Sequence, residues 1–401
     1  MNFAKFLIPL AATLSFVGCS SDDSGLSKAS SGDEGGTTHV SVDYSKGRTM
    51  NAKIGRGISM GNSWESTGKD MNQDAGWGNP ILDSDFQVVK DAGFNSVRLP
   101  VRWNCDAEVN APYTIDQNRL AGVLEDVSII NSLGMVAIVN FHHYETHNQC
   151  YGDGLVTAAQ NIKNDPDTYA LEKERFLAMW KQVATALNAF PDDMVVLEIL
   201  NEPNGIASSA TINDMMLSAY NVIREAAPGK TIMFEGNGYS KFAEIKKLEL
   251  PQDGNIIVSG HYYEPYEFTH QGTAGDQYPC GAKITSSDLT NIAREFKSYI
   301  DTIKVYFPDS DGIHSVPVNM GEFGGVGRTG SQCGEEAPSE AMRAQWTDYV
   351  IRAAESYGIS WQYWAYGKTS GFQAYDQSLE AWMPEMKAIF DKYTSKPFSQ
   401  Q

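Results

Sequence analysis

The sequence predicts an α/β fold of the (β/α)8 TIM-barrel type, built as a single domain. Short apolar runs of strand length alternate about eight times with amphipathic segments, which is the pattern of a parallel barrel. The segment 37–401 fits the size of a barrel with inserted loops. Polar side chains gather where the apolar runs end, and a barrel brings those positions to one face. A doubly wound open sheet is the alternative, but it would not collect these side chains in one place.

The predicted strands are the apolar runs. Val195 to Leu200 is rich in β-branched residues, as expected of a strand buried on both faces, and Pro203 soon ends the pairing. The segment His39 to Tyr44 alternates and predicts a small strand at the floor of the barrel. The eight barrel strands are predicted over residues 53–59, 94–99, 135–141, 194–200, 231–235, 256–261, 315–320 and 359–364.

Helical patterns fill the intervals between these strands. Leu120, Val123, Leu124 and Val127 recur at helical spacing, and Gly134 ends that helix. The predicted helices cover residues 83–91, 116–132, 167–189, 211–226, 240–247, 286–305, 338–356 and 380–392.

The first 36 residues predict export rather than folded structure. Residues 1–19 have a positive Lys5 and an apolar run too short to span a bilayer, as in a signal peptide. The run ends Phe16-Val17-Gly18-Cys19, which resembles a bacterial lipoprotein signal with Cys19 as the lipidated residue. Residues 20–36 are rich in Ser, Gly and Asp and predict a flexible linker. We therefore expect an outer-membrane or cell-surface lipoprotein, or, after ordinary signal cleavage, a secreted protein.

Charge and motif content exclude several classes of function. The net charge of -19 argues against nucleic acid or an anionic membrane surface as partner. No nucleotide-binding loop, metal cluster or cofactor motif occurs in the sequence, so we expect no cofactor and no metal.

The cysteines after Cys19 predict two disulfides, because their number is even and the chain is expected to be exported. Cys105 and Cys150 follow predicted strands two and three, whereas Cys280 and Cys333 follow strands six and seven. Adjacent loops favour these two pairs, although the other two connectivities stay open. A zinc site is the alternative, but no two of these cysteines have ligand spacing.

Polar and aromatic residues concentrate at the ends of the predicted strands. A lone arginine there often serves only in an ion pair, but one site at the carboxyl face of a barrel explains the whole set. Glu202 and Glu322 end separate strands, and hydrolysis of a glycosidic bond requires such a pair of carboxyl groups. The set is Arg98, His142, His143, Asn201, Glu202, His261, Tyr263, Glu322 and Trp364.

These residues fall into motifs that resemble a known family. From about Lys53 to Tyr393 the chain resembles the retaining β-glycanases of glycoside hydrolase family 5, in which catalytic glutamates follow strands four and seven. Ser59 and Met60 depart from the usual Asn-Leu of the first motif. The motifs are Gly57-Ile58-Ser59-Met60-Gly61-Asn62, Arg98-Leu99-Pro100, Phe141-His142-His143, Asn201-Glu202-Pro203, His261-Tyr262-Tyr263, Gly321-Glu322-Phe323-Gly324 and Trp364.

The resemblance implies a role for each glutamate. Glu202 matches the acid/base and Glu322 the nucleophile. Arg98 is expected beside Glu322, where a cation favours the ionised form, and Tyr263 is expected to donate a hydrogen bond to the same carboxylate. Glu202 faces a carboxylate and apolar walls, which favour the protonated form that an acid catalyst needs.

The resemblance also implies substrate contacts. Asn201 is placed to hold the sugar 2-hydroxyl, and Trp364 matches an aromatic platform beneath the sugar. His142 and His261 match two histidines that shape the site, with His261 near the acid/base. His143 is expected to contact substrate or to pack beside it.

The remaining polar and aromatic candidates are less specific. Glu198 shares strand parity with Glu202, so we expect it to point into the barrel as a buried ion-pair partner. Glu145, Glu235 and Glu264 also follow strands, but the sequence assigns them no role. Aromatic residues in loops at the expected catalytic face fit either substrate subsites or loop packing. Asn62 and Trp64 are expected to bind substrate. The other loop aromatics are Trp77, Trp103, Tyr144, Tyr266 and Phe268.

The predicted function is therefore retaining, endo-acting hydrolysis of β-1,4-glucan, of the cellulase or endoglucanase type. The same catalytic set serves mannan, xyloglucan and mixed-linkage glucan, so these substrates remain alternatives. A catalytically inactive, anchored glycan-binding protein is a remote alternative from another class. We expect a monomer whose partner is a β-glucan polysaccharide or oligosaccharide, and which contacts a membrane only through lipid on Cys19.

Overall fold

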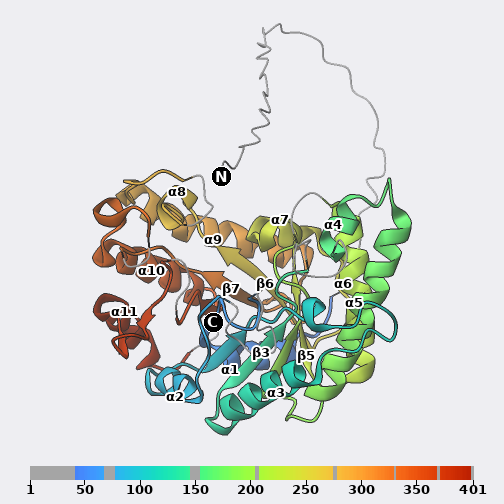
Figure 1. Ribbon diagram of the computed structural model, residues 1–401. Helices are drawn as coiled ribbons and strands as arrows, with labels where there is room; N and C mark the ends of the chain where they lie inside the picture. The colour runs from blue at the N-terminus through green and yellow to red at the C-terminus, as the bar shows by residue number, and fades with distance from the viewer. Residues whose placement is uncertain are drawn as a thin grey trace, which may run out of the picture. The chain divides into compact units, whose positions relative to one another are not determined.

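The computed structural model describes residues 41–66, 77–144, 154–203, 207–273, 278–328, 331–367 and 371–398, all within the compact unit His39–Gln401. Eight parallel strands follow one another around a closed barrel, and β1 pairs with β8 to complete it (Figure 1). The predicted fold class is therefore confirmed.

Every strand of the barrel is short and buried along its whole length. A small antiparallel pair, β9 (Tyr375–Asp376) and β10 (Ala381–Trp382), follows the barrel in the chain. The barrel strands are β1 (Arg56–Ser59), β2 (Ser96–Leu99), β3 (Val136–Asn140), β4 (Val195–Glu198), β5 (Thr231–Glu235), β6 (Ile256–Tyr262), β7 (Val318–Phe323) and β8 (Ser360–Tyr363).

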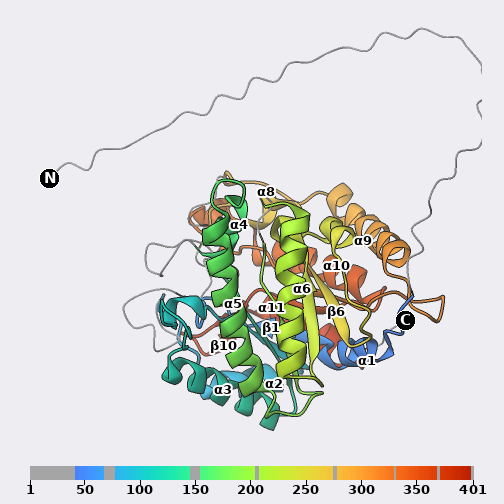
Figure 2. The ribbon, with the colours of Figure 1, turned by 90° about the vertical axis from the view of Figure 1, so that its right-hand side faces the viewer.

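Helices surround the barrel, and α5 and α6 run side by side along one flank (Figure 2). Asp116 caps α3 by accepting from two backbone N–H groups, and Thr285 with Asp288 forms a capping box at the start of α9. Among the described residues, no helix is long and apolar enough to cross a membrane. The α-helices are α1 (Ser45–Ile54), α2 (Asp83–Asp91), α3 (Gln117–Ser132), α4 (Leu155–Gln160), α5 (Pro166–Leu187), α6 (Ser209–Ala226), α7 (Asn237–Ser240), α8 (Tyr266–Thr269), α9 (Ser286–Tyr306), α10 (Glu340–Glu355) and α11 (Pro384–Thr394), and the 3-10 turns are η1 (Asn104–Asp106), η2 (Phe242–Lys247) and η3 (Gly334–Glu336).

The floor of the barrel differs from the prediction. The strand predicted from Lys53 begins only at Arg56, because Lys53 and Ile54 end α1 and Gly55 leaves the helix with φ 51°. Within the predicted strand 39–44, residues 39 and 40 lie outside the described residues, and Val42 forms only an isolated bridge with Asp309. The floor is therefore closed by a helix.

The helical region predicted over 240–247 also takes another form. It comprises the last residue of α7 and the 3-10 turn η2. Within α7, Gly238 and Tyr239 have φ of 69° and 63°, and Ser240 has φ 53°. This segment, residues 238–240, is called the left-handed turn below.

The interior of the barrel changes from apolar to charged along the strands. Met50 and Ile54 of α1 cluster with Val136, Ile138 and other apolar residues near the amino ends of the strands. Because side chains alternate along a strand, the inward positions that follow are Asn140 on β3, Glu198 on β4 and Glu235 on β5. All three are completely buried. The polar site is thus built on a sealed apolar layer.

Candidate active site

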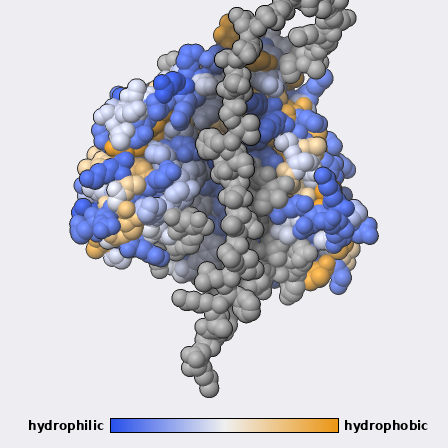
Figure 3. Space-filling view, turned by 90° about the horizontal axis from the view of Figure 1, so that it is seen from above, coloured by the Kyte–Doolittle hydropathy of each residue, from blue (hydrophilic) through white to orange (hydrophobic). Residues whose placement is uncertain are grey.

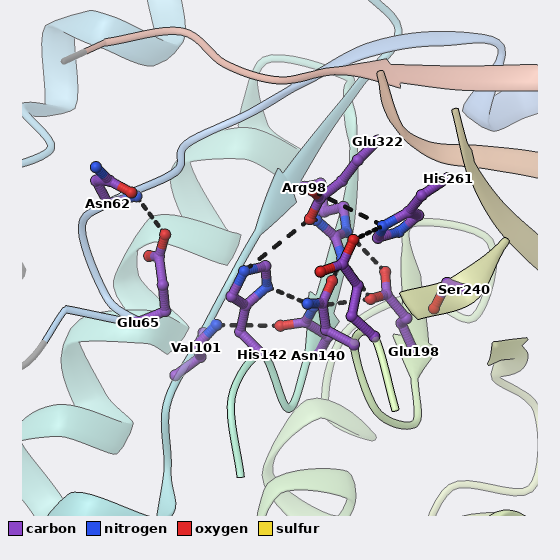
Figure 4. Close-up of polar contacts among 12 residues, drawn as sticks. Asn62, Glu65, Arg98, Val101, Asn140, His142, Glu198, Ser240, His261 and Glu322 are labelled. Atoms are coloured by element: carbon purple, nitrogen blue, oxygen red, sulfur yellow. Dashed lines mark hydrogen bonds and ion pairs between the residues drawn. The ribbon is translucent and has the colours of Figure 1, made fainter. Parts of the chain in front are cut away.

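Arg98 of β2 is the centre of the site (Figure 4). Its buried guanidinium makes a bidentate pair with Glu198, with Nε 2.8 Å from Oε2 and Nη2 2.6 Å from Oε1. Nη1 donates to Oε1 of Glu322 at 2.6 Å, and Nη2 donates to Oδ1 of Asn201 at 2.6 Å. Burial disfavours the charge, but Glu198 and Glu322 raise the pKa of Arg98 well above its ordinary value. A permanent cation therefore lies beneath the site, and Glu198 is the buried ion-pair partner that strand parity predicts.

Glu322 of β7 accepts a hydrogen bond on each carboxylate oxygen. Arg98 donates to Oε1, and the Tyr263 hydroxyl donates to Oε2 at 2.9 Å, so both expected contacts are present. Burial raises the pKa of the Glu322 carboxyl above its ordinary value, while His261 and Arg98 oppose that rise. Both donors bind the ionised form, so Glu322 is fixed in orientation and stabilised as a carboxylate.

Glu202 follows β4 and is the more accessible carboxyl group. Its side chain is 27% exposed, against 6% for Glu322, and its backbone adopts a positive φ of 47°. One oxygen of each carboxylate and one ring nitrogen of His261 lie within 4.8 Å of one another. This separation suits a retaining glycosidase, whose carboxyl groups lie about 5–5.5 Å apart, rather than an inverting one.

His261 of β6 lies between two carboxylates. Its Nδ1 is 2.7 Å from Oε1 of Glu202, and its Nε2 is 3.1 Å from Oε1 of Glu235. Burial favours the neutral ring, but the negative charges of Glu235 and Glu322 raise the pKa of His261 well above its ordinary value. Only the protonated ring can donate from both nitrogens. His261 is thus a charged donor beside Glu202.

Glu235 is a functional candidate to which the sequence assigns no role. It ends β5 and is completely buried. Although burial favours its neutral form, His261 and Arg98 lower the pKa of Glu235 to about 2. Its position at the end of strand five, with inward parity, is the signal that identifies it.

His142 follows β3, and its surroundings favour the neutral ring. Asn140 lies 3.3 Å from His142 Nδ1 and donates its second amide hydrogen to Glu198 at 2.7 Å. Burial, aided by His143 and Arg98, lowers the pKa of His142 well below its ordinary value. If Asn140 donates to Nδ1, the ring proton is on Nε2, which lies 4.0 Å from Glu322 Oε1.

Trp364 stacks on His142. The ring centroids are 5.5 Å apart and the planes differ by 5°, while His143 meets His142 edge to face at 4.3 Å. Trp364 directly follows β8 and is partly exposed. The three rings form an aromatic surface beside Glu322.

Asn201 has a donor that the described residues leave unused. Its Oδ1 accepts from Arg98, and its backbone N–H donates to the carbonyl of Phe141 at 2.8 Å. Its Nδ2 is buried and has no partner within the described part of the chain. A donor held in this way is available to a substrate hydroxyl.

The structure places the two candidates that follow β1 differently. The backbone N–H of Asn62 donates to the carboxylate of Glu65 (Figure 4). The backbone N–H of Ser63 donates to the same carboxylate, which is completely buried. Trp64 instead packs against α3, where its indole N–H donates to Asp126 at 2.7 Å. Trp64 is part of the main apolar core cluster and its ring lies against Gly122 of α3, which corrects its expected place at the substrate.

Most of the other loop aromatics also pack internally. Trp103, Tyr144 and Phe268 are at most 1% exposed, whereas Trp77 is 41% exposed. Glu264 is partly buried, and Glu145 lies outside the described residues. Seen from above, the visible coloured residues of the surface are largely hydrophilic (Figure 3).

One predicted disulfide is present between Cys280 and Cys333, with the Cα atoms 5.4 Å apart. Cys105 is also disulfide-bonded, and Cys150, the partner expected for it, lies outside the described residues, as does Cys19.

The described residues offer one group with metal-binding geometry, namely Glu202, His261 and Glu322. A metal would need a lone pair on His261, but both of its nitrogens face carboxylates and its raised pKa favours the protonated ring. The group therefore fits acid–base chemistry better than metal binding.

Comparison with known proteins supports the chemistry of the site. Residues 58–370 match the family model described as "Cellulase (glycosyl hydrolase family 5)". Endoglucanase H of Acetivibrio thermocellus is 28% identical over 320 residues, which are 79% of this chain and 30% of that protein. The chain thus spans less than a third of that relative's length.

Solved structures extend the similarity to the fold. Endoglucanase Cel5A of Thermotoga maritima is 31% identical, with a TM-score of 0.70, over 87% of this chain and 100% of that one. A structure of Thermotoga maritima Cel5A in complex with mannotriose is 30% identical, with a TM-score of 0.71, over 86% of this chain and 99% of that one.

Proposed function

The chain belongs to glycosyl hydrolase family 5, the cellulase family, and on that basis we propose that it cleaves β-1,4-glucan internally and with retention of configuration. The observation that carries this proposal is the pair Glu202 and Glu322, whose nearest oxygens lie within 4.8 Å. Their surroundings differ, because Glu322 is buried between Arg98 and Tyr263 while Glu202 is accessible beside His261.

In the first step Glu322 attacks the anomeric carbon. A bond forms between its oxygen and that carbon as the glycosidic bond breaks, and Glu202 gives its proton to the departing oxygen. In the second step Glu202 takes a proton from water, the water oxygen bonds to the same carbon, and the bond to Glu322 breaks. Both carboxyl groups return to their starting states.

The remaining residues are proposed to bind the sugar at the point of cleavage. Asn201 Nδ2 donates to the 2-hydroxyl, a contact that strengthens in the oxocarbenium-like transition state. Trp364 provides a face for the sugar C–H groups, with His142 and His143 beside it. Asn62 directly follows Gly61, where a Cβ atom would lie 2.6 Å from the Trp364 indole, and Trp64 is left out because it packs in the core.

The identity of the polysaccharide is the finer part of the proposal. The endoglucanase relatives favour β-1,4-glucan. The mannotriose complex of Thermotoga maritima Cel5A makes mannan the first alternative, followed by xyloglucan and mixed-linkage glucan.

Export is a separate proposal. Residues 1–19 would direct export, and lipid on Cys19 would hold the protein at the cell surface through residues 20–36. Val42, near the start of the described chain, bridges Asp309, which precedes β7. The described chain therefore begins near the amino end of a strand, whereas the glutamates lie at the carboxyl ends of strands. Mass spectrometry of the mature N-terminus tests this proposal, since unmodified Cys19 or cleavage elsewhere would contradict it.

The test of substrate is hydrolysis of carboxymethyl cellulose, barley β-glucan, xyloglucan and galactomannan by the purified protein. Cleavage of the glucans, with a rapid fall in viscosity, supports an endoglucanase. Cleavage of galactomannan alone would keep the mechanism and overturn the substrate. Tight binding without turnover would favour the inactive glycan-binding protein.

Azide rescue assigns the two glutamates separately. Glu322→Ala should be inactive alone and form an α-glycosyl azide from an activated aryl β-cellobioside, because azide replaces the nucleophile. Glu202→Ala should instead form the β-glycosyl azide from the glycosyl-enzyme. Glu335→Ala, which alters an exposed glutamate, is the control. Exchange of the two products between the variants would reverse the assignment.

A further inference from the structure

We propose that Glu235 is a positioning residue that fixes the acid/base Glu202 through its backbone and through His261. The inference rests on the proposed role of Glu202. Glu235 is completely buried beneath these groups, so it acts on the reaction only through them.

The first link runs through the backbone. Oε2 of Glu235 accepts from the backbone N–H of Glu202 at 2.9 Å. Glu202 has φ 47°, a conformation that residues with a side chain rarely adopt and that its surroundings must hold. Glu235 supplies a charged acceptor at this strained position.

The left-handed turn strengthens the same link. Ser240 donates its hydroxyl to Oε2 of Glu235 at 2.5 Å, and Tyr239 donates its backbone N–H to the carbonyl of Pro203 at 3.0 Å. Glu202 and the left-handed turn, which both have positive φ, therefore donate hydrogen bonds to the same oxygen, Oε2 of Glu235. The bond from Tyr239 to Pro203 connects the two segments directly.

The second link runs through His261. Oε1 of Glu235 lies 3.1 Å from Nε2, and the opposite nitrogen lies 2.7 Å from the Glu202 carboxyl. An anion at Nε2 keeps the ring protonated, so Nδ1 remains a donor and orients Glu202. The charged or titratable groups around His261 are Glu202, Glu235 and Glu322, with Arg98 3.9 Å from Glu235 and His142 near enough to influence its charge.

The two links predict a defect specific to proton transfer. Without the negative charge, His261 loses its proton more readily and Glu202 loses an oriented donor. Departure of a poorly acidic alcohol needs the proton of Glu202, whereas departure of dinitrophenolate does not. A purely structural Glu235 would affect both kinds of substrate alike.

The experiment compares Glu235→Gln with the unmodified protein on two aryl β-cellobiosides. For phenyl β-cellobioside, kcat/KM should fall by about 10- to 100-fold, part of the usual contribution of general acid catalysis. For 2,4-dinitrophenyl β-cellobioside it should change by less than about threefold. The alkaline limb of the kcat/KM profile for the phenyl substrate should move to lower pH. Without the anion of Glu235, the His261 ring that orients Glu202 loses its proton at lower pH.

The controls separate the possible failures. Glu225→Gln, in an exposed position of α6, should change neither substrate. Equal losses on both substrates, or an unmoved alkaline limb, would overturn the inference. If the unmodified protein hydrolyses neither cellobioside, the proposed substrate fails rather than the role of Glu235.

Nuclear magnetic resonance of His261 tests the inference without any variant that must fold. With ¹⁵N-labelled histidine, both nitrogens of His261 should carry a proton at pH 7 in the unmodified full-length protein. A neutral ring at that pH would overturn the proposal, whatever the catalytic activity. If Glu235→Gln folds, its His261 should titrate at lower pH.

Discussion

At the scale of single residues, the site depends on how few groups hold the charges. Arg98 contacts Glu198, Glu322 and Asn201 at once, so its position sets an ion pair, the proposed nucleophile and a proposed substrate contact together. Buried charges are tolerated because each carboxylate has a donor in place. The loss of any one donor therefore leaves a buried carboxylate less stable in its ionised form.

Tyr263→Phe tests this at Glu322, the proposed nucleophile. The change removes the hydroxyl that donates to Glu322 while leaving a ring that packs against Phe372. Since a hydrogen bond to a charged group contributes about 1.5–3 kcal/mol, kcat should fall by about 10- to 100-fold.

The pH profile of Tyr263→Phe shows in which direction the pKa of Glu322 changes. Burial raises the pKa of Glu322, so the acid limb of kcat/KM should lie above that of an ordinary glutamate. Loss of the Tyr263 donor should move the limb to still higher pH, because the carboxylate loses stabilisation. Tyr299→Phe is the control, and an acid limb that moves to lower pH would contradict this view of the nucleophile.

At the scale of elements, small irregularities bring the catalytic groups together. Between β6 and β7 the register shifts, so that Gly260 pairs with Met320 but His261 pairs with Glu322. The shift passes over Gly321, where a Cβ atom would lie 3.0 Å from the His261 ring. It therefore places His261 and Glu322 opposite each other.

Gly61→Ala tests the packing of the loop after β1 against Trp364. A Cβ atom at Gly61 would lie 2.6 Å from the indole, so the ring must move and KM should rise about tenfold, or about 1.4 kcal/mol. Gly325→Ala is the matched control, because its nearest contact would be at 3.8 Å. An unchanged KM in Gly61→Ala would argue against Trp364 as the sugar platform.

Glu65 in the same loop should make stability depend on pH. Burial raises the pKa of Glu65 from 4.5 to about 7, so between these values the folded protein binds more protons here than the unfolded chain. The contribution of Glu65 to the free energy of unfolding should therefore be present below about pH 4.5 and be lost as pH rises through about 7.

Denaturant unfolding at pH 5 and pH 8 measures this effect. As pH rises, the unmodified protein should lose unfolding free energy relative to Glu65→Gln. Glu225→Gln should show no such dependence. A difference that is the same at both pH values would refute the assignment to Glu65.

At the scale of the whole molecule, the barrel accounts for the convergence of distant residues. Seven strands, β2 to β8, place the groups around Glu202 and Glu322 on one face, while α1 and apolar side chains seal the opposite end. The disulfide Cys280–Cys333 spans 53 residues and joins the loops after β6 and β7. This bond restricts the unfolded chain far more than it restricts the folded barrel.

Replacement of both Cys280 and Cys333 by serine should therefore lower stability without removing a catalytic group. Loop-closure entropy for that separation predicts a loss of about 4 kcal/mol in the free energy of unfolding. Denaturant titration measures it, with Ser378→Ala, in an exposed position, as the control. Unchanged stability would contradict the expected constraint of this bond on the unfolded chain.

The sequence predicts those features of the protein that follow from hydrophobic periodicity and from the residues at the ends of strands. The barrel and the grouping of Arg98, Glu202 and Glu322 follow from those patterns. Trp64 was predicted wrongly, because loop position does not reveal that its indole finds Asp126 on α3. Glu235 received no role because its function depends on His261, far along the chain, and Lys53 was misassigned because apolar residues suit a capping helix as well as a strand.

The charges around the glutamates have a consequence for inhibition. Three buried carboxylates, Glu198, Glu235 and Glu322, face two cations, Arg98 and His261. One negative charge is left unbalanced at the place where, under the proposed mechanism, the sugar becomes cationic. An imino sugar, whose ring nitrogen is protonated before it arrives, carries the matching charge from the outset. This pocket is therefore suited to capture such a drug-like mimic more tightly than the neutral sugar it resembles.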